Sequence, residues 1–196
     1  MKITLASNSQ IRKQLMTSAG VSFDAVSSPF DEEALKRRLL SENESSEAIS
    51  LALAKGKAEA VAKKTDGLVI GSDQVLNFKG NLLSKPTDLE HARAQLKDLR
   101  NQDHQLLSAV AIYEGPDCIW SHVGVVTLTM HDFSDSYLEE YLQRNWNSIR
   151  SSVGGYKLEE EGVRLFSKID GDYFTVLGMP LMEVLKVLAQ RGTIRS

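Results

Sequence analysis

Two charged side chains, Asp73 and Lys85, stand a short distance apart in the sequence, each beside a short apolar run. Aspartate oxygens suit Mg²⁺ or Mn²⁺, and a lysine supplies a point charge that attracts phosphate oxygens. Held on neighbouring strands, the pair could bind a metal-chelated polyphosphate. The same residues are also compatible with an ordinary core strand that carries two solvated charges.

The elements that would position this pair form a β-hairpin. Residues 68–70, Leu-Val-Ile, are typical of a strand, and a glycine and a serine then bring the backbone to Asp73 where the apolar run ends. Residues 78–81, Phe-Lys-Gly-Asn, indicate a turn, after which two leucines lead back to Lys85. The sequence therefore predicts an acid at the tip of a hairpin and a lysine on the returning arm.

A second polar group lies near the N-terminus. Residues 2–6 predict a short strand that feeds a helix over 9–19, and the link between them, residues 7–9, reads Ser-Asn-Ser. A helix N-terminus presents free backbone N–H groups and the positive end of the helix dipole, both favourable to phosphate. Arg12 could add a forked, charge-assisted pair. Simple N-capping by Ser9 explains the same residues.

An acidic cluster, Asp-Glu-Glu at residues 31–33, follows a predicted strand over 23–26. Adjacent acids usually mark the solvated start of a helix, and the polar chain from here to Ser46 is expected to be mobile. If one of these acids faced the same site as Asp73, the two carboxylates could share a divalent ion. The sequence alone leaves that approach open.

Composition excludes several classes of function. The chain has 196 residues, of which 42% are hydrophobic and 25% charged, as in globular proteins that bury a core. The formal net charge of -3 disfavours nucleic acid as a partner. Cys118 is the one cysteine, so a disulfide within the chain is impossible, and we expect its thiol to pack in the core or at its edge. No signal peptide and no apolar run of about 18 residues is present, which predicts a cytoplasmic protein away from membranes.

Hydrophobic periodicity predicts the other elements. Further helices are expected over 46–64, after a capping box at 87–90, and over 134–145 and 180–190, and further strands over 105–113, 118–130, 163–169 and 174–177. Residues 151–162 form a charged loop bracketed by glycines. Lys57 falls in the middle of a helix, where a lysine is ordinarily exposed. No repeat or linker divides the chain, so we predict a single α/β domain over 1–196.

The chain resembles the Maf family of nucleoside triphosphate pyrophosphatases over nearly its whole length. The matching pieces, in the family's order, are Leu5 to Ser9 with Arg12, Asp31-Glu32, Leu53 to Ala58, Gly71 to Val75, Lys85-Pro86, His104, Ile169 to Tyr173 and Val176 to Leu181. The resemblance implies an elongated, curved mixed sheet flanked by helices, with two lobes around a cleft. It also implies a homodimer, which the long hairpin predicted over 105–130 could support.

The resemblance also implies roles for particular residues. The family's catalytic base falls on Asp73 and its second metal-binding acid on Glu32, the phosphate-binding lysines fall on Lys57 and Lys85, and the N-terminal phosphate loop falls on Ser7 and Arg12. Asp73 and Glu32 would together hold Mg²⁺ or Mn²⁺. The implied reaction is hydrolysis of a nucleoside triphosphate between the α and β phosphates, which releases the monophosphate and pyrophosphate.

Two departures affect the N-terminal loop and the lysine motif. The family's usual Ser-Pro-Arg-Arg is Ser-Gln-Ile-Arg at residues 9–12, which removes one arginine and the proline, and Ser84 replaces the glycine before Lys85.

Three positions bear on the choice of base: Ile11, Gln74 and Glu159. Gln74 and Glu159 resemble the 7-methyl-GTP pyrophosphatase branch rather than the branch that acts on dTTP and UTP. A carboxylate suits guanine, whose N1–H and N2 amino group are adjacent donors, and suits the positive charge that N7 methylation adds. Ile11 offers apolar cover without aromatic stacking. The expected substrate is 7-methyl-GTP, with dTTP or UTP as the alternative.

A second class of function stays open, a nucleotide-responsive protein in division control, or septum formation, with little turnover. A purely structural protein would require all four main charged positions, at residues 32, 57, 73 and 85, to be incidental. The physiological nucleotide, the metal and the oligomeric state are undetermined by the sequence.

Overall fold

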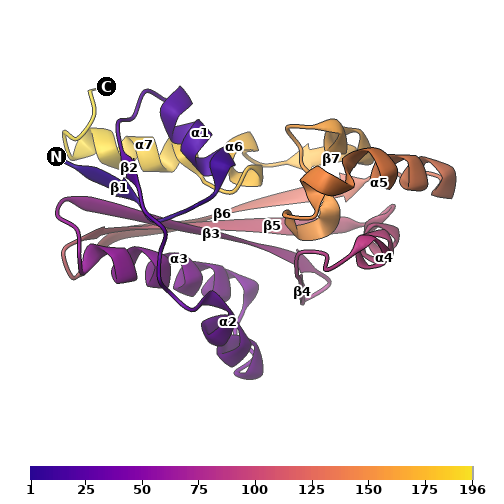
Figure 1. The fold of residues 1–196 in the computed structure, drawn as a ribbon, viewed down its shortest axis with the longest axis horizontal. Coiled ribbons are helices and arrows are strands. Elements are labelled where there is room, and N and C mark those ends of the chain that lie inside the picture. The colour runs from indigo at the N-terminus through magenta and orange to yellow at the C-terminus, as the bar shows by residue number, and fades with distance from the viewer. Residues whose placement is uncertain (196) are drawn as a thin grey trace. The chain divides into compact units, whose positions relative to one another are not determined.

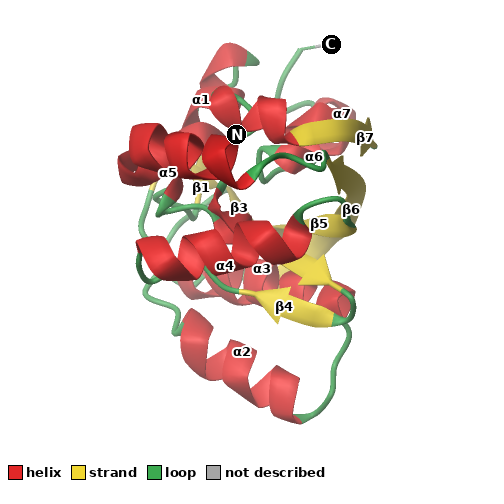
Figure 2. Cartoon of the chain, turned by 90° about the vertical axis from the view of Figure 1, so that its right-hand side faces the viewer, coloured by secondary structure: helices red, strands yellow, loops and turns green. Residues whose placement is uncertain are grey.

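The structure is a computed structural model that describes residues 1–195. Its helices and strands are drawn in Figure 1 and coloured by type in Figure 2. The helices are α1 (Gln10–Ser18), α2 (Glu32–Ser41), α3 (Ser46–Ala62), α4 (Leu89–Leu99), α5 (Asp135–Ile149), α6 (Tyr173–Val176) and α7 (Leu181–Gln190). The strands are β1 (Ile3–Leu5), β2 (Asp24–Ala25), β3 (Leu68–Phe78), β4 (Asn81–Leu83), β5 (Asp103–Glu114), β6 (Asp117–Met130) and β7 (Phe166–Asp170). Two 3₁₀ turns cover Val153–Gly155 and Glu161–Leu165.

The strands form one mixed sheet of seven strands, in the order β2-β1-β3-β5-β6-β7, with β4 paired to β3. β1 pairs in parallel with both β2 and β3, and its register places Ile3 opposite Leu68. β4 runs antiparallel to β3 and β7 antiparallel to β6. The predicted mixed α/β sheet flanked by helices is confirmed, as is the hairpin that joins β3 to β4.

Contacts divide the chain into two compact units. The first unit contains residues 1–74, 107–124 and the chain from Asp172 onward, and the second contains 75–106 and 125–171. Strands β3, β5 and β6 each contribute residues to both units. The two units are described separately below.

In the first unit the sheet is buried on both faces, because its central strands alternate between two apolar clusters. On β3, Leu68 and Ile70 belong to the cluster that contains residues of α1 and α7, whereas Val69 belongs to the cluster that contains residues of α3. Figure 1 shows α1 and α7 on one side of the sheet and α3 on the other. Burial of each such aliphatic side chain stabilises the fold by about 1.5–3 kcal/mol.

Helix α3 lies unusually close to β3, because small residues face the strand. Ala54 and Ala58 are fully buried there, and a Cβ added to Gly71 would lie 2.3 Å from the Ala54 carbonyl oxygen. The approach brings the side chain of Lys57 to the strand. Lys57 is buried, so the expectation of an exposed mid-helix lysine is wrong.

The second unit combines a helix pair with an aromatic cluster. Arg93 on α4 forms a bidentate ion pair with Glu139 on α5, at 2.6 and 2.7 Å. Water reaches both side chains and screens their charges, so this ion pair adds little to the stability of the fold. The buried aromatic cluster of His104, Tyr156 and Phe166 lies in the same unit, where the Tyr156 and Phe166 rings meet edge to face with centroids 4.8 Å apart.

Several predicted elements need correction. The polar segment predicted to be mobile contains α2, which begins after Asp31, whose side chain accepts a hydrogen bond from the Ala34 N–H at 3.0 Å. Residues 174–177, predicted as a strand, belong mainly to the short helix α6, because Asp172 caps it through the Thr175 N–H. A local side-chain cap here outweighs the strand preference of aromatic and β-branched residues.

Smaller differences concern boundaries and caps. The N-cap of α4 is Asp88, one residue after the start of the predicted capping box. The loop over 151–162 contains a 3₁₀ turn near its start. A second 3₁₀ turn occupies the beginning of the strand predicted over 163–169, so that strand starts only at Phe166. Cys118 is exposed, so its predicted packing in or beside the core is wrong. Within residues 1–195, no helix is long and apolar enough to cross a membrane.

Candidate active site

Asp73 lies in the interior of β3, and not at the tip of a hairpin as predicted. The strand continues to Phe78, so the apolar run ends before the strand does. Asp73 is buried with 12% of its side chain exposed. A carboxylate at such a position requires a charged or hydrogen-bonding partner, because burial of an unpaired charge is costly.

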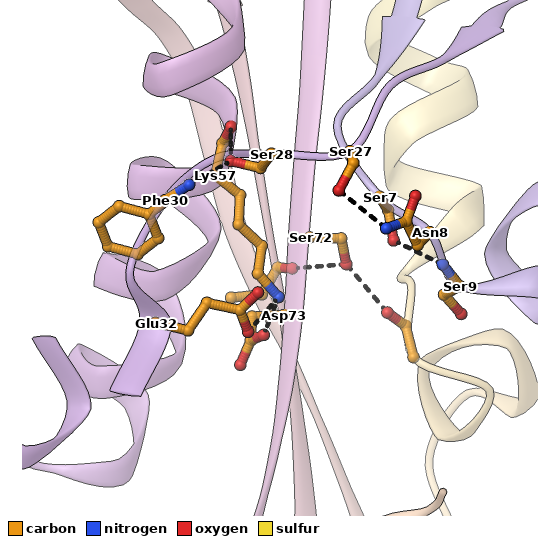
Figure 3. Close-up of polar contacts among 12 residues, drawn as sticks. Ser7, Asn8, Ser9, Ser27, Ser28, Phe30, Glu32, Lys57, Ser72 and Asp73 are labelled. Carbon is orange, nitrogen blue, oxygen red and sulfur yellow. Dashed lines mark hydrogen bonds and ion pairs between the residues drawn. The ribbon is translucent and has the colours of Figure 1, made fainter. Parts of the chain in front are cut away.

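Lys57 supplies that partner and also contacts a second acid. Its Nζ atom lies 2.5 Å from Asp73 Oδ1 and 2.8 Å from Glu32 Oε2. Figure 3 shows the three side chains converging, with the lysine ammonium between the carboxylates. We call Glu32, Lys57 and Asp73 the acid–lysine triad. The structure therefore brings together three of the four main charged residues that the sequence singled out.

Each member of the triad comes from a different element. Asp73 is on β3 and Lys57 on the buried face of α3, whereas Glu32 is the first residue of α2. Ser28 Oγ donates to the Lys57 carbonyl oxygen at 3.1 Å and so ties the segment before α2 to α3. The Glu32 side chain is 47% exposed while that of Lys57 is 10% exposed, so the triad opens toward solvent on the Glu32 side.

A buried arginine, Arg12, contacts the backbone next to Asp73. Arg12 Nε donates to the Gly178 carbonyl at 2.8 Å, and its Nη1 donates to the Ser72 carbonyl at 3.0 Å. Burial lowers the pKa of the Arg12 guanidinium, and the negative charges of Asp73 and Glu32 oppose that shift. Its predicted contact with substrate phosphate stays a prediction, since two of its N–H groups are used by main-chain carbonyls.

Ser72 also holds the backbone beside Asp73, and sequence reasoning missed it. Its buried hydroxyl lies 2.9 Å from the carbonyl oxygens of both Ala109 and Gly178, and its single proton can be donated to either of them. The backbone just before Asp73 is thus held by Arg12 on one side and by the neighbouring strand on the other. Nothing in the local sequence distinguishes this serine from one in a turn.

The N-terminal serines cap α1. Ser9 Oγ accepts from the Arg12 N–H, and Ser7 Oγ accepts from the Ser9 N–H at 3.2 Å. Asn8 Nδ2 donates to Ser27 Oγ at 2.8 Å (Figure 3). The N-capping interpretation is confirmed, and phosphate binding by Ser7 stays a prediction that capping does not oppose.

Of the three residues assigned to base choice, two lie in the first unit. Gln74 Nε2 lies within hydrogen-bond distance of Ser108 Oγ (2.9 Å) and of the carbonyls of Thr175 (3.1 Å) and Val176 (2.9 Å). The amide nitrogen is therefore committed to protein acceptors. Ile11 is half-buried and packs against the cluster that contains residues of α1 and α7.

Lys85 and Glu159 lie in the second unit, and both are exposed. Lys85 follows β4, as the predicted hairpin requires, and Glu159 is in a turn between the two 3₁₀ turns. Their convergence with the acid–lysine triad stays a prediction.

The donor set of the triad fits a divalent cation of the Mg²⁺ type. Mg²⁺ is usually bound by one or two carboxylates together with water and substrate phosphates, and not by a cage made of protein ligands alone. Asp73 and Glu32 provide two such carboxylates. Among residues 1–195 no group of three or more His, Cys, Asp and Glu side chains could hold a metal ion. The two carboxylates of the triad thus match the part that protein ligands usually play at a Mg²⁺ site.

Comparison with known proteins places the chain in a family. The model of the Maf family, described as Maf-like protein, matches residues 2–191. A nucleoside triphosphate pyrophosphatase of Roseobacter denitrificans is 54% identical over 98% of this chain and 97% of its own length. A 7-methyl-GTP pyrophosphatase of Rhizobium johnstonii is 42% identical, over 98% of each chain.

One solved structure, the Ham1 protein of Staphylococcus aureus, is similar with a TM-score of 0.44 and 19% identity, over 67% of this chain and 73% of that one. The family match extends over nearly the whole sequence and includes all the residues of the acid–lysine triad. This chain therefore belongs to the Maf family of Maf-like proteins.

Proposed function

We propose that this protein hydrolyses nucleoside triphosphates between the α and β phosphates and releases the nucleoside monophosphate and pyrophosphate. Its curated relatives are named as pyrophosphatases, and it is, like them, a hydrolase that acts on acid anhydrides. The observation that carries the proposal is the acid–lysine triad, in which a buried aspartate, a second acid and an ammonium group meet within 2.8 Å.

Asp73 is the proposed general base. In the free protein Lys57 engages its Oδ1 atom at 2.5 Å, which leaves Oδ2 to accept a proton from water. The water oxygen then forms a bond to the α phosphorus while the bond from that phosphorus to the bridging oxygen breaks, and pyrophosphate leaves. Because Arg12 and Ser72 hold the preceding backbone, the base has little freedom to move away from this position.

The negative charge of the triphosphate requires several cations. We assign this role to Lys57, Lys85 and Arg12, and we assign Ser7, which lies just before α1, to a hydrogen bond with phosphate. Asp73 and Glu32 would hold Mg²⁺ or Mn²⁺, which when bound would neutralise phosphate charge and orient the phosphate chain. The support in the first unit is the proximity of Glu32 to Asp73 through their shared lysine.

Replacement of Asp73 by asparagine tests the proposal. Asparagine has nearly the same shape but cannot accept the proton, so we expect kcat for pyrophosphate release to fall by about 10²–10⁴-fold. The measurement is pyrophosphate release with Mg²⁺ or Mn²⁺, with circular dichroism as the check on folding. Asp66→Asn, which changes an exposed aspartate just before β3, is the matched control and should leave turnover unchanged.

Undiminished turnover by folded Asp73→Asn would exclude Asp73 as the base. Tight nucleotide binding by the wild-type protein without pyrophosphate release would instead favour the nucleotide-responsive division-control protein.

We further propose 7-methyl-GTP as the preferred substrate. A relative named 7-methyl-GTP pyrophosphatase is 42% identical to this chain, while the name of the 54% identical relative specifies no base. Gln74 supports the proposal, because its nitrogen donates to the protein and its oxygen is left to accept from a base N–H. Exposed Glu159 would pair with the adjacent donors of guanine and would repel the carbonyl groups of thymine or uracil.

A substrate panel tests this preference. We expect kcat/KM for 7-methyl-GTP to exceed that for dTTP and UTP by about 30-fold, which corresponds to about 2 kcal/mol for one good bidentate base contact. Glu159→Gln should remove most of the difference, whereas Glu160→Gln, a change in the neighbouring exposed acid, should preserve it. Preference for dTTP or UTP would support the alternative substrate class, and indifference of both enzymes to the base would defeat the argument.

Two further proposals are a cytoplasmic location, which the sequence features predict, and a homodimer, which the family resemblance implies. We assign the dimer surface to the hairpin of β5 and β6, in which β6 is partly exposed and β5 is mostly buried. With a net charge of -3, we expect neither nucleic acid nor a membrane surface as a partner.

A further inference from the structure

The acid–lysine triad already contains a cation at the place where a metal would bind. Lys57 Nζ contacts Asp73 Oδ1 and Glu32 Oε2, one oxygen from each of the two carboxylates proposed to hold the metal. Figure 3 shows the ammonium group between the two acids. A divalent ion held by these carboxylates would have to displace the ammonium or share their oxygens with it.

The charges around this point cancel in the free protein. Glu32 and Asp73 carry two negative charges, and Lys57 and the buried Arg12 carry two positive charges, with the charges of both acids acting on the guanidinium of Arg12. A site without net charge attracts a divalent cation weakly, because removal of water from the ion is not compensated. The carboxylates are in place, but their charge is already neutralised.

We propose that Lys57 is a built-in counter-cation that keeps the metal off Asp73 and Glu32 until a triphosphate binds. This inference rests on the proposed function and adds the order of binding to it. The negative phosphates attract the ammonium away from the carboxylates and at the same time supply the charge and the oxygen ligands that the metal needs. Metal and nucleotide therefore strengthen each other's binding, and by linkage the effect is reciprocal.

The arrangement also fits the burial of the three side chains. The Lys57 and Asp73 side chains are 10% and 12% exposed, whereas the Glu32 side chain is 47% exposed and stands at the first turn of α2. Without a counter-cation, the buried Asp73 charge would be left unpaired in the empty enzyme. Lys57 thus stabilises the free protein through the same contact that opposes metal binding.

The test is direct titration of the protein with Mn²⁺, followed by electron paramagnetic resonance of the free ion, in the absence of nucleotide. Lys57→Met removes the charge and keeps the length of the chain, and Lys57→Gln also keeps a hydrogen-bond donor for Asp73, which protects folding. We expect each variant to bind one Mn²⁺ at least about tenfold more tightly than the wild-type protein. Lys55→Met is the matched control, because it removes one positive charge from the same helix and should leave Mn²⁺ affinity near the wild-type value.

A second measurement needs no variant. The probe is a nucleoside triphosphate analogue with a methylene group in place of the α–β bridging oxygen. In its presence the wild-type protein should bind Mn²⁺ at least about tenfold more tightly, after correction for Mn²⁺ bound to the free analogue. The inference is overturned if the Lys57 variants bind Mn²⁺ no more tightly than the wild type, if Lys55→Met tightens binding equally, or if the analogue has no effect.

These outcomes separate the inference from the proposed function. Pyrophosphate release by the wild-type protein together with unchanged Mn²⁺ affinity in the Lys57 variants would leave the hydrolase intact and remove the counter-cation role. Tighter Mn²⁺ binding by the variants without wild-type turnover would support the counter-cation and contradict the hydrolase.

Discussion

At the scale of single residues, Arg12 has one role that the family resemblance predicts and another that the structure shows. The resemblance assigns it to substrate phosphate, whereas the structure shows its guanidinium donating to the carbonyls of Ser72 and Gly178. A Cβ at Gly178 would lie 3.3 Å from Arg12 Nη2, so the backbone there leaves room for the guanidinium. The fork of Arg12 therefore anchors the backbone next to the proposed base.

Arg12→Lys tests the anchoring role. A single ammonium cannot reproduce the forked contact to two carbonyls, and loss of one charge-assisted hydrogen bond costs about 2 kcal/mol. We expect the free energy of unfolding in urea to fall by about that amount without any ligand present. A change in KM at unchanged stability would instead show that Arg12 serves the phosphates alone. Lys13→Met, which alters the next residue of α1, should change stability by no more than about 0.5 kcal/mol.

At the scale of elements, the close approach of α3 to β3 positions the site. The strand can carry Asp73 to within 2.5 Å of Lys57 because Gly71 leaves space for the helix backbone. A Cβ at this position would lie 2.3 Å from the Ala54 carbonyl oxygen and 2.7 Å from the Ala58 nitrogen. Backbone atoms cannot rotate away as a side chain can.

Gly71→Ala should therefore separate the helix from the strand. We expect a loss of unfolding free energy of about 3 kcal/mol, at the upper end of the usual cost of overpacking, together with reduced turnover. The matched control is Gly56→Ala on the same helix, where the added Cβ would meet the ring of half-buried Phe30, which can move. Since alanine also favours a helix over glycine by about 1 kcal/mol, this variant should be the more stable of the two. The reverse order would contradict the account.

At the scale of the whole molecule, each unit has buried residues of its own, and those of the second unit include a histidine, His104. His104 shares a hydrogen bond of 2.7 Å between its Nε2 and the Tyr156 hydroxyl, and its Nδ1 has no hydrogen-bond partner among residues 1–195. Burial lowers the pKa of His104 to about 4 from the usual 6.5, with a smaller opposing effect from Asp103. The folded protein therefore holds this imidazole neutral.

The stability of the protein should consequently depend on His104 in acid. His104 takes up a proton near pH 6.5 in the unfolded chain but only near pH 4 in the folded chain. Its neutral form in the folded protein therefore causes no loss of stability above pH 6.5, and stability is lost as the pH falls toward 4. Between pH 7.5 and pH 5 the expected loss of unfolding free energy from this group is about 2 kcal/mol. His104→Gln should lack that part of the pH dependence, measured by urea unfolding at both pH values. His131→Gln, at an exposed histidine, should retain it.

Much of the fold could be predicted from local patterns. The hairpin of β3 and β4, the helix cap Ser9, and the periodic helices α3 and α5 follow from turn residues, a capping side chain and apolar spacing. The failures have the same local origin. Helix α2 is too polar to show a clear apolar face, and α6 consists of residues that favour strands but is capped by Asp172.

The site was predictable only in part. Asp73, Lys57 and Glu32 were named through a family resemblance, whereas residue types alone suggested only that Asp73 could share an ion with some acid near residue 32. Ser72 gave no local signal, because its importance lies in carbonyls from β5 and from the turn before α7.

The sequence by itself determined the class of fold, the family and the charged residue types, because these follow from periodicity, composition and the order of short motifs along the chain. Only the tertiary structure decided that Lys57 is buried between Glu32 and Asp73, and that Arg12 and Ser72 hold the strand beside the base. The physical reason is that a charge interaction depends on distance and burial, and both are set by the packing of α3 against β3.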